Sequence, residues 1–316
     1  MARSSILVGG QAVIEGVMMR VPGGYATAVR RKDGTVSVDR HEHLPLTQRF
    51  FLGKVPVIRG VLSLFESTRI GIQSLQWSAD MMMEDEEEAS RENQGGLGSV
   101  LTTTLGVGLG LGLFLALPIW ITTRLFQIEQ QMFAFNLAAG VLRIAFFLIY
   151  LLLISRMEDI GRLFQYHGAE HKTIYTFESG DDVVPERAAQ QSRFHPRCGT
   201  SFLFVVLLTA IVVYAVIDSL ALLAFGQLGL GGRLLLHLTF LPLVAGAGYE
   251  MIKLTSANMD NVLFRALARP GLWLQRITTR EPDRKQIEVA IVALESAFGE
   301  QYGEYAGKEY IAEAVA

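Results

Sequence analysis

Hydrophobic positions along the chain gather into four long runs, and polar or charged residues dominate between these runs. The runs cover residues 97–123, 133–155, 201–225 and 234–254. A helix crosses the hydrocarbon core of a bilayer with about 20 apolar residues, so each run is long enough to span a membrane. Because no run shows an amphipathic period, the pattern favours membrane helices over a buried soluble core. It predicts a mainly α, polytopic membrane protein with about four transmembrane helices.

Shorter patterns predict the parts outside the membrane. Apolar and polar residues alternate on both sides of Asp33-Gly34, which is typical of a β-hairpin with a tight turn. Residues 55–82 show the period of an amphipathic helix, which is expected either to lie on the membrane surface or to pack on the hairpin. A further amphipathic helix is predicted after Pro282, in the C-terminal part of the chain.

These segments divide the chain into four parts. They are a small N-terminal α+β cytoplasmic part, an acidic linker, a four-helix membrane domain and a C-terminal cytoplasmic helical tail. Their bounds are 1–83, 84–96, 97–254 and 255–316. Within the membrane domain, residues 156–200 are expected to form a loop that carries the candidate site.

Basic residues predict how the spans are oriented, because lysine and arginine concentrate in cytoplasmic loops. Residues 156–200 contain six of them, whereas the loops after the first and third runs contain one each, Arg124 and Arg233. Both termini and the segment at residues 156–200 are therefore expected in the cytoplasm.

Composition limits the partners and the compartment. Half of the 316 residues are hydrophobic, and the net charge is −3. This charge argues against a nucleic-acid-binding protein, which needs a concentrated basic surface. The single cysteine, Cys198, excludes an intrachain disulfide. The expected surroundings are the lipid bilayer, with lipids or membrane proteins as substrates or partners.

The stretch YHGAEHKTIY, residues 166–175, contains the pattern H-x-x-E-H. On a helix, His167 and His171 lie one turn apart on one face, close enough to bind one metal ion. Glu170 beside them is placed to act as a general base, as in the inverted zinc-protease motif. The alternative is a hydrogen-bonded helix end in which the three polar residues have no catalytic role.

Further candidate ligands lie in the sequence FHPRCGTSF just before the third apolar run. His195 and Cys198 carry nitrogen and sulfur donors, which zinc or another divalent metal accepts. Four protein ligands would make a closed structural site, whereas three ligands and water would make a catalytic one. The sequence leaves both alternatives open.

Two other sets of residues are candidates for function. In GGQAVIEGVMMR, residues 9–20, two glycines suggest a backbone turn that presents Gln11 and Glu15, with Glu15 as a second catalytic carboxylate. The alternative for this segment is an ordinary first strand or helix. Asp218 and His237 lie toward the outer ends of the third and fourth runs, where intramembrane ionisable groups often face each other.

Five blocks of the sequence, in this order, resemble the YqhQ-like family of bacterial membrane proteins. They are GGQAVIEGVMMR, VPVIRGV, YHGAEHKTI, HPRCGTSF and PGLWLQRITTREPDRKQIEVAI. The family is described as predicted metal-dependent enzymes. The resemblance implies a multi-pass protein of the bacterial inner membrane with a metal site at His167, Glu170 and His171.

Two functions are compatible with these features. The first is a membrane-embedded, metal-dependent hydrolase with a cytoplasm-facing site, in which the metal activates water. The second is a non-enzymatic membrane assembly, insertion or transport factor in which the segment at residues 156–200 is structural. The sequence does not indicate the substrate.

Overall fold

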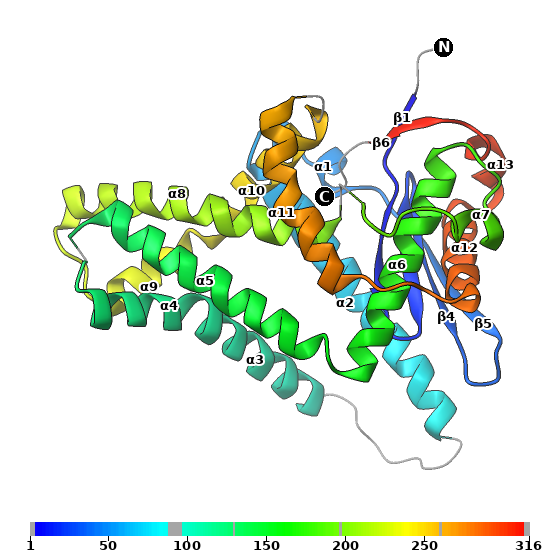
Figure 1. Cartoon of the computed structure of the whole chain (residues 1–316), viewed down its shortest axis with the longest axis horizontal. Coiled ribbons are helices and arrows are strands. Elements are labelled where there is room, and N and C mark those ends of the chain that lie inside the picture. Colours follow the sequence, from blue (N-terminus) through cyan, green and yellow to red (C-terminus); the bar gives the residue numbers. More distant parts are fainter. Residues whose placement is uncertain (1–3, 88–96, 129, 196–197, 259–260, 313–316) are drawn as a thin grey trace.

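The computed structural model describes residues 4–87, 97–128, 130–195, 198–258 and 261–312. In these residues apolar helices project to one side of a small sheet that is covered by further helices (Figure 1). The arrangement confirms a mainly α membrane protein with an N-terminal β part.

The sheet has four antiparallel strands in the order β2-β3-β4-β5. These strands are β2 (Gly9–Val13), β3 (Gly16–Val21), β4 (Gly24–Arg30) and β5 (Val36–Glu42). The predicted hairpin is present: β4 and β5 pair around a turn in which Gly34 has a φ of +90°. Glycine fits there because this left-handed conformation strains other residues. A separate parallel pair joins β1 (Ser4–Ile6) to β6 (Tyr310–Ala312).

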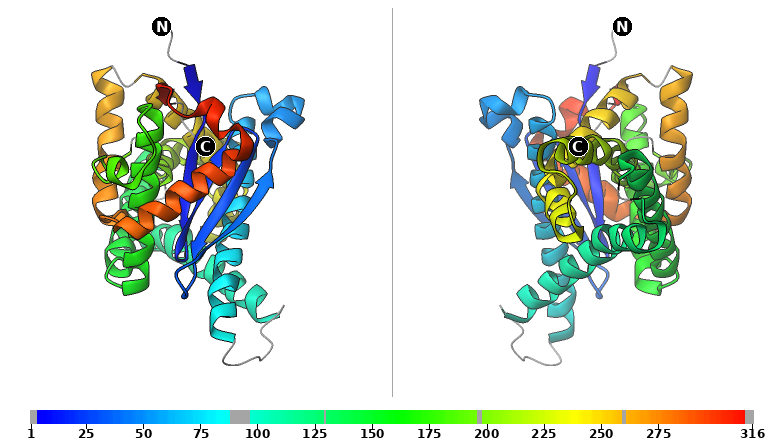
Figure 2. Two further views of the ribbon diagram at one scale, coloured as in Figure 1. Left: turned by 90° about the vertical axis from the view of Figure 1, so that its right-hand side faces the viewer. Right: turned by 90° about the vertical axis from the view of Figure 1, so that its left-hand side faces the viewer.

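Helices cover both faces of this sheet, and alternate residues of β3 show why. Val17 and Met19 pack into a core with the helices α6 (Glu158–Glu178) and α12 (Arg284–Phe298). Met18 points to the opposite face and packs with Ile70 of α2 (Ile58–Glu87). Successive strand residues point to opposite faces, so residues 17–19 of β3 are all apolar because both faces are buried there. Figure 2 shows α12 lying across the sheet.

Segments that lie far apart in the sequence meet in the core between the sheet, α6 and α12. Residues 156–200 contain the 21-residue helix α6, and the C-terminal part contributes α12 to the same core. The N-terminal part, the central segment and the tail therefore pack as one unit. Amphipathic periodicity shows which face of a helix is buried but not which distant segment covers it. The expected acidic linker falls largely on residues 88–96, outside the described residues.

The remaining helices and short turns connect these layers. They are α1 (Leu46–Arg49), η1 (Phe51–Lys54), α7 (Pro185–Ala188), α11 (Val262–Thr278), η4 (Gly299–Gln301) and α13 (Tyr302–Tyr305). Helix α2, which was expected on the membrane surface or on the hairpin, packs against both the sheet and α10.

Three helical segments are long and apolar enough to cross a membrane: Thr104–Phe126, Met132–Ile154 and Phe202–Phe225. The first segment runs from within α3 (Leu97–Leu111) through η2 (Gly112–Ala116) and α4 (Leu117–Ile121) to the end of η3 (Thr122–Phe126). The second is α5 (Met132–Ile154), and the third is most of α8 (Gly199–Phe225).

The fourth predicted span is not one straight helix. It consists of α9 (Leu230–Thr239) and α10 (Leu241–Ala257), which meet at an angle of 48°. Pro242 lies in the first turn of α10. Because proline has no backbone N–H and its ring clashes with the preceding turn, it favours a helix start at this point.

A buried polar cluster joins the apolar helices α5, α8 and α9. The Asp218 carboxylate accepts hydrogen bonds from His237 Nε2 at 2.9 Å and from Asn136 Nδ2 at 2.7 Å. Arg233 lies 3.7 Å from the same carboxylate, and Arg143 donates to His237 Nδ1 at 3.3 Å. Asp218 and His237 therefore face each other, as the sequence suggested.

Candidate metal centre

Helix α6 presents the H-x-x-E-H residues on one face, toward the start of α8. Gly168, inside the motif, is required where the chain after α11 crosses this helix. A Cβ atom at Gly168 would lie 2.1 Å from the carbonyl oxygen of Arg280, and Arg280 N donates to Phe164 O at 2.8 Å. A side chain at position 168 would therefore separate the two segments.

Backbone carbonyls orient both histidines. His167 Nδ1 lies 2.8 Å from Thr278 O, and His171 Nδ1 lies 2.6 Å from Arg193 O. A carbonyl oxygen only accepts hydrogen bonds, so each Nδ1 carries the proton and donates it. Each Nε2 is then the nitrogen that could bind a metal, an arrangement typical of metal-ligating histidines.

Cys198 completes the group from the N-cap of α8. Its Sγ lies 3.1 Å from His167 Nε2 and 3.1 Å from Thr200 Oγ1. One ligand atom from each of His167, His171 and Cys198 lies within 4.8 Å of the others. A tetrahedral zinc ion with bonds of 2.0–2.3 Å needs ligand separations of about 3.3–3.8 Å. Small side-chain shifts would therefore fit a metal to these three donors.

Without a metal, His167 and Cys198 shift each other's pKa. Burial alone would raise the pKa of Cys198, but the adjacent His167 and His171 hold it well below its usual range. Burial would lower the pKa of His167, but the Cys198 thiolate and Glu170 raise it to about 9. A metal ion would displace the proton on His167 Nε2 and take over the thiolate as a ligand.

Glu170 lies beside this group and is only 4% exposed. Its Oε2 is 3.4 Å from His171 Nε2. The carboxylate also faces β2, where a Cβ atom at Gly10 would lie 3.0 Å from Oε1. Glu170 thus lies between His171 and the strand.

His195, an expected ligand, has a different position. Its Nε2 is 3.6 Å from Glu178 Oε2, and its ring packs on Tyr175. Gln275 binds both its backbone N–H and its carbonyl oxygen at 2.7 Å, and that carbonyl also accepts from Cys198 N at 3.3 Å. His195 therefore bonds to Gln275 and Cys198 through its backbone, and the group of ligand atoms does not include its side chain.

Glu15, expected as a second catalytic carboxylate, lies away from the three ligands. It occupies the β2–β3 turn with a φ of +50° and pairs with Arg162, whose Nε donates to Oε1 at 2.6 Å. Tyr166 donates to Oε2 at 3.2 Å. These contacts attach the hairpin to α6. A polar residue after two glycines is typical of such a strand turn, the alternative that the sequence left open for this segment.

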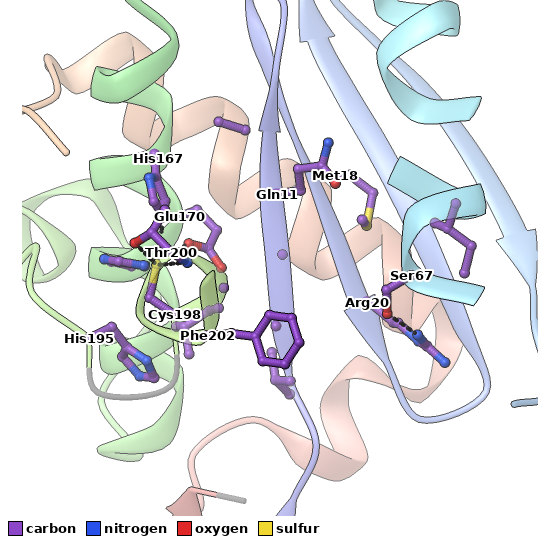
Figure 3. A pocket seen from close by; sticks show the side chains of 18 of the residues that line it. Gln11, Met18, Arg20, Ser67, His167, Glu170, His195, Cys198, Thr200 and Phe202 are labelled. Atoms are coloured by element: carbon purple, nitrogen blue, oxygen red, sulfur yellow. Dashed lines mark hydrogen bonds and ion pairs between the residues drawn. The ribbon is translucent and has the colours of Figure 1, made fainter. Parts of the chain in front are cut away.

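A cavity of about 450 Å³ adjoins the candidate metal centre (Figure 3). Its lining is mainly apolar and comes from the sheet, α2, α6, α8 and α10. Gln11, noted in the sequence, also lines it, together with three polar residues that sequence analysis missed: Arg20, Ser67 and Thr200. Arg20 pairs with Glu66 at 2.8 Å. These residues come from separate elements, so no local motif marked them.

The fold and this site define a class: a membrane protein with an extramembrane sheet unit and a buried His/His/Cys group. Residues 55–300 match the family described as "Protein of unknown function (DUF1385)", and the chain belongs to this family. It is 32% identical over 300 residues to "Uncharacterized protein YqhQ" of Bacillus subtilis (strain 168), covering 90% of this chain and 89% of that protein. No solved structure matches the chain.

Proposed function

We propose that the protein is a metal-dependent hydrolase of the bacterial inner membrane, with its site facing the cytoplasm. The supporting observation is the convergence of His167, His171 and Cys198, with both imidazoles held through Nδ1. Two imidazoles and one thiolate suit zinc. Three protein ligands leave a fourth position for water, which is the pattern of catalytic zinc sites.

The chemistry follows from the neighbouring groups. A zinc ion bound here would lower the pKa of a water ligand toward about 7. Glu170 accepts a proton from the attacking water and delivers it to the leaving group. Its burial against β2 keeps this carboxylate close to the reacting atoms.

The location of the cavity supports a substrate that comes from the membrane. Phe202 of α8 and Ile252 of α10 line it, and both belong to apolar helices. Arg20 and Ser67 lie at its polar side. An amphiphilic substrate, a lipid or a segment of a membrane protein, fits such a lining.

The membrane orientation can be tested independently. Reporter fusions at residue 182 are expected to read cytoplasmic, and fusions at residue 227 external, because basic residues concentrate in the central segment. An external signal at residue 182 would place the candidate centre on the wrong side of the membrane and contradict this part of the proposal.

Elemental analysis tests the metal itself. Full-length protein purified in detergent without chelator is expected to contain about one zinc per chain. His167→Ala and Cys198→Ser should lose it, because two donors bind zinc poorly. His195→Ala is the matched control and should retain zinc, since the contacts of His195 with Gln275 are made by its backbone. Wild-type protein without a transition metal would refute the proposal.

Maleimide labelling gives a second readout, because Cys198 is the single cysteine. A metal-bound thiolate should resist labelling, and chelation should restore it. In chelated protein the rate should change little from pH 8 to pH 6, because the pKa of Cys198 is well below its usual range. A thiol with a pKa of about 8.5 would instead slow about tenfold per pH unit. Rapid labelling with metal bound would remove Cys198 from the ligand set.

A further inference from the structure

The cavity beside the candidate metal centre runs along one edge of the sheet. Five consecutive residues, 8–12, line it, so side chains of both orientations of β2 border the same space. In the part of the chain that the structure describes, β2 pairs with β3 alone and is an edge strand. The cavity therefore follows the backbone of β2, including its unpaired side.

The register shows which backbone groups point outward. In an antiparallel ladder, alternate residues bond to the partner strand, and those between them direct N–H and C=O to the other side. Arg30 N donates to Glu15 O beside β3, and this bond shows which residues of β3 bond to β4. The residues of β3 between them bond to β2, and the β2–β3 register identifies their partners in β2. Gly10 and Ala12 are the β2 residues whose N–H and C=O point away from β3.

Glu170 lies over the face of β2 at this edge. A Cβ atom at Gly10 would lie 2.8 Å from Glu170 Cγ. Figure 3 shows Glu170, His167 and Cys198 next to the strand that carries Gln11. A chain paired with β2 would therefore lie in the cavity that Glu170 and the three ligands also line.

The two edges of the sheet also differ in composition. Proteins usually protect an exposed edge strand with charged residues or proline, because its free N–H and C=O groups pair with other chains. The opposite edge strand, β5, carries Asp39, Arg40 and Glu42. Strand β2 has the sequence GGQAV, with no charge and no proline. The edge beside the candidate centre is thus open to pairing.

We propose that the substrate is an extended polypeptide that adds to the edge of β2 through hydrogen bonds to Gly10 and Ala12. This inference rests on the proposed hydrolase and assigns it peptide bonds as substrate. The water oxygen attacks the carbonyl carbon, the C–N bond breaks, and Glu170 transfers a water proton to the leaving nitrogen. The edge from residue 8 to residue 12 is about 13 Å long at 3.3 Å per residue, enough for four substrate residues.

Peptide hydroxamates test this pairing on the full-length, zinc-loaded protein in detergent. The probes are acetohydroxamic acid and an acetylated alanyl-leucyl tetrapeptide hydroxamate, which share one metal-binding group. The tetrapeptide should bind about 10- to 100-fold more tightly, because several backbone hydrogen bonds are added. Methylation of the peptide amides at alternate positions should weaken binding of the tetrapeptide. Methylation at the intervening positions should leave its affinity unchanged. Hydrogen exchange at Gly10 and Ala12 should slow when it binds.

Proline variants separate edge pairing from general effects. Ala12→Pro removes one outward N–H and no bond to β3, a position where edge strands tolerate proline. The Ala12→Pro variant should lose most of the difference in affinity between the tetrapeptide and acetohydroxamic acid. Its affinity for acetohydroxamic acid should be unchanged. Val38→Pro is the control, because the backbone N–H of Val38 points away from β4 on the opposite edge strand β5. This variant should change the affinity for neither probe.

The outcomes distinguish the two proposals. Equal binding of both probes, or uniform tolerance of amide methylation, would refute edge pairing while leaving the metal-dependent hydrolase intact. Protein that contains no metal would refute the hydrolase itself. The methylation series needs no protein variant, so it remains decisive even where Ala12→Pro fails to fold.

Discussion

Replacing Glu170 with Gln is expected to lower hydrolysis by about 10²- to 10⁴-fold, the usual contribution of a general base. The amide keeps the shape of the carboxylate but does not accept a proton from water. Zinc content should stay at the wild-type level, because the ligand group is His167, His171 and Cys198. Turnover of quenched-fluorescent peptides and fluorogenic acyl esters, together with elemental analysis, measures both effects.

Glu15→Gln is the matched control for this experiment. Its carboxylate pairs with Arg162 and Tyr166 outside the cavity lining, so the variant should keep turnover within a few-fold of wild type. Equal hydrolysis by the Glu170→Gln variant and wild type would remove Glu170 from catalysis. Growth complementation by that variant in a deletion strain would instead support an assembly, insertion or transport factor.

Asp218→Ala is expected to lower the free energy of unfolding by about 3–5 kcal/mol, the cost of breaking a buried charge pair. The carboxylate is the acceptor for His237 and Asn136 and lies beside Arg233. Removing it leaves buried donors and a guanidinium charge without compensation inside the apolar helices. Denaturant unfolding in mixed micelles measures the loss.

The neighbouring Ser219→Ala provides the control on the same helix. Ser219 is exposed, and its hydroxyl donates to Ala215 O, one turn away, so its loss should change stability by less than about 0.5 kcal/mol. Equal stability of the Asp218→Ala and Ser219→Ala variants would show that the polar cluster does not stabilise the helix bundle. Function would then be the remaining explanation for a buried Asp, His and two Arg in apolar helices.

Local chemistry accounts for what could be predicted without the structure. Membrane spans depend on apolar length, and the runs near residues 104–126, 132–154 and 202–225 are found where the hydrophobic pattern predicts them. The hairpin at Gly34 depends on a conformation that glycine adopts readily. His167 and His171 share a face because a helix repeats every 3.6 residues. Each of these features is determined within about 25 neighbouring residues.

Contacts between distant segments were decided only by the tertiary structure. His195 and Cys198 are both close to α8 in sequence and both carry donor atoms. Cys198 joins the group of ligand atoms with the two histidines, whereas Gln275 and Glu178 hold His195 beside it. Glu15 pairs with Arg162 because the β2–β3 turn packs on α6. The open edge of β2 beside Glu170 likewise arises from sheet order and helix packing. Sequence spacing does not encode such contacts, because they depend on which amphipathic faces bury each other.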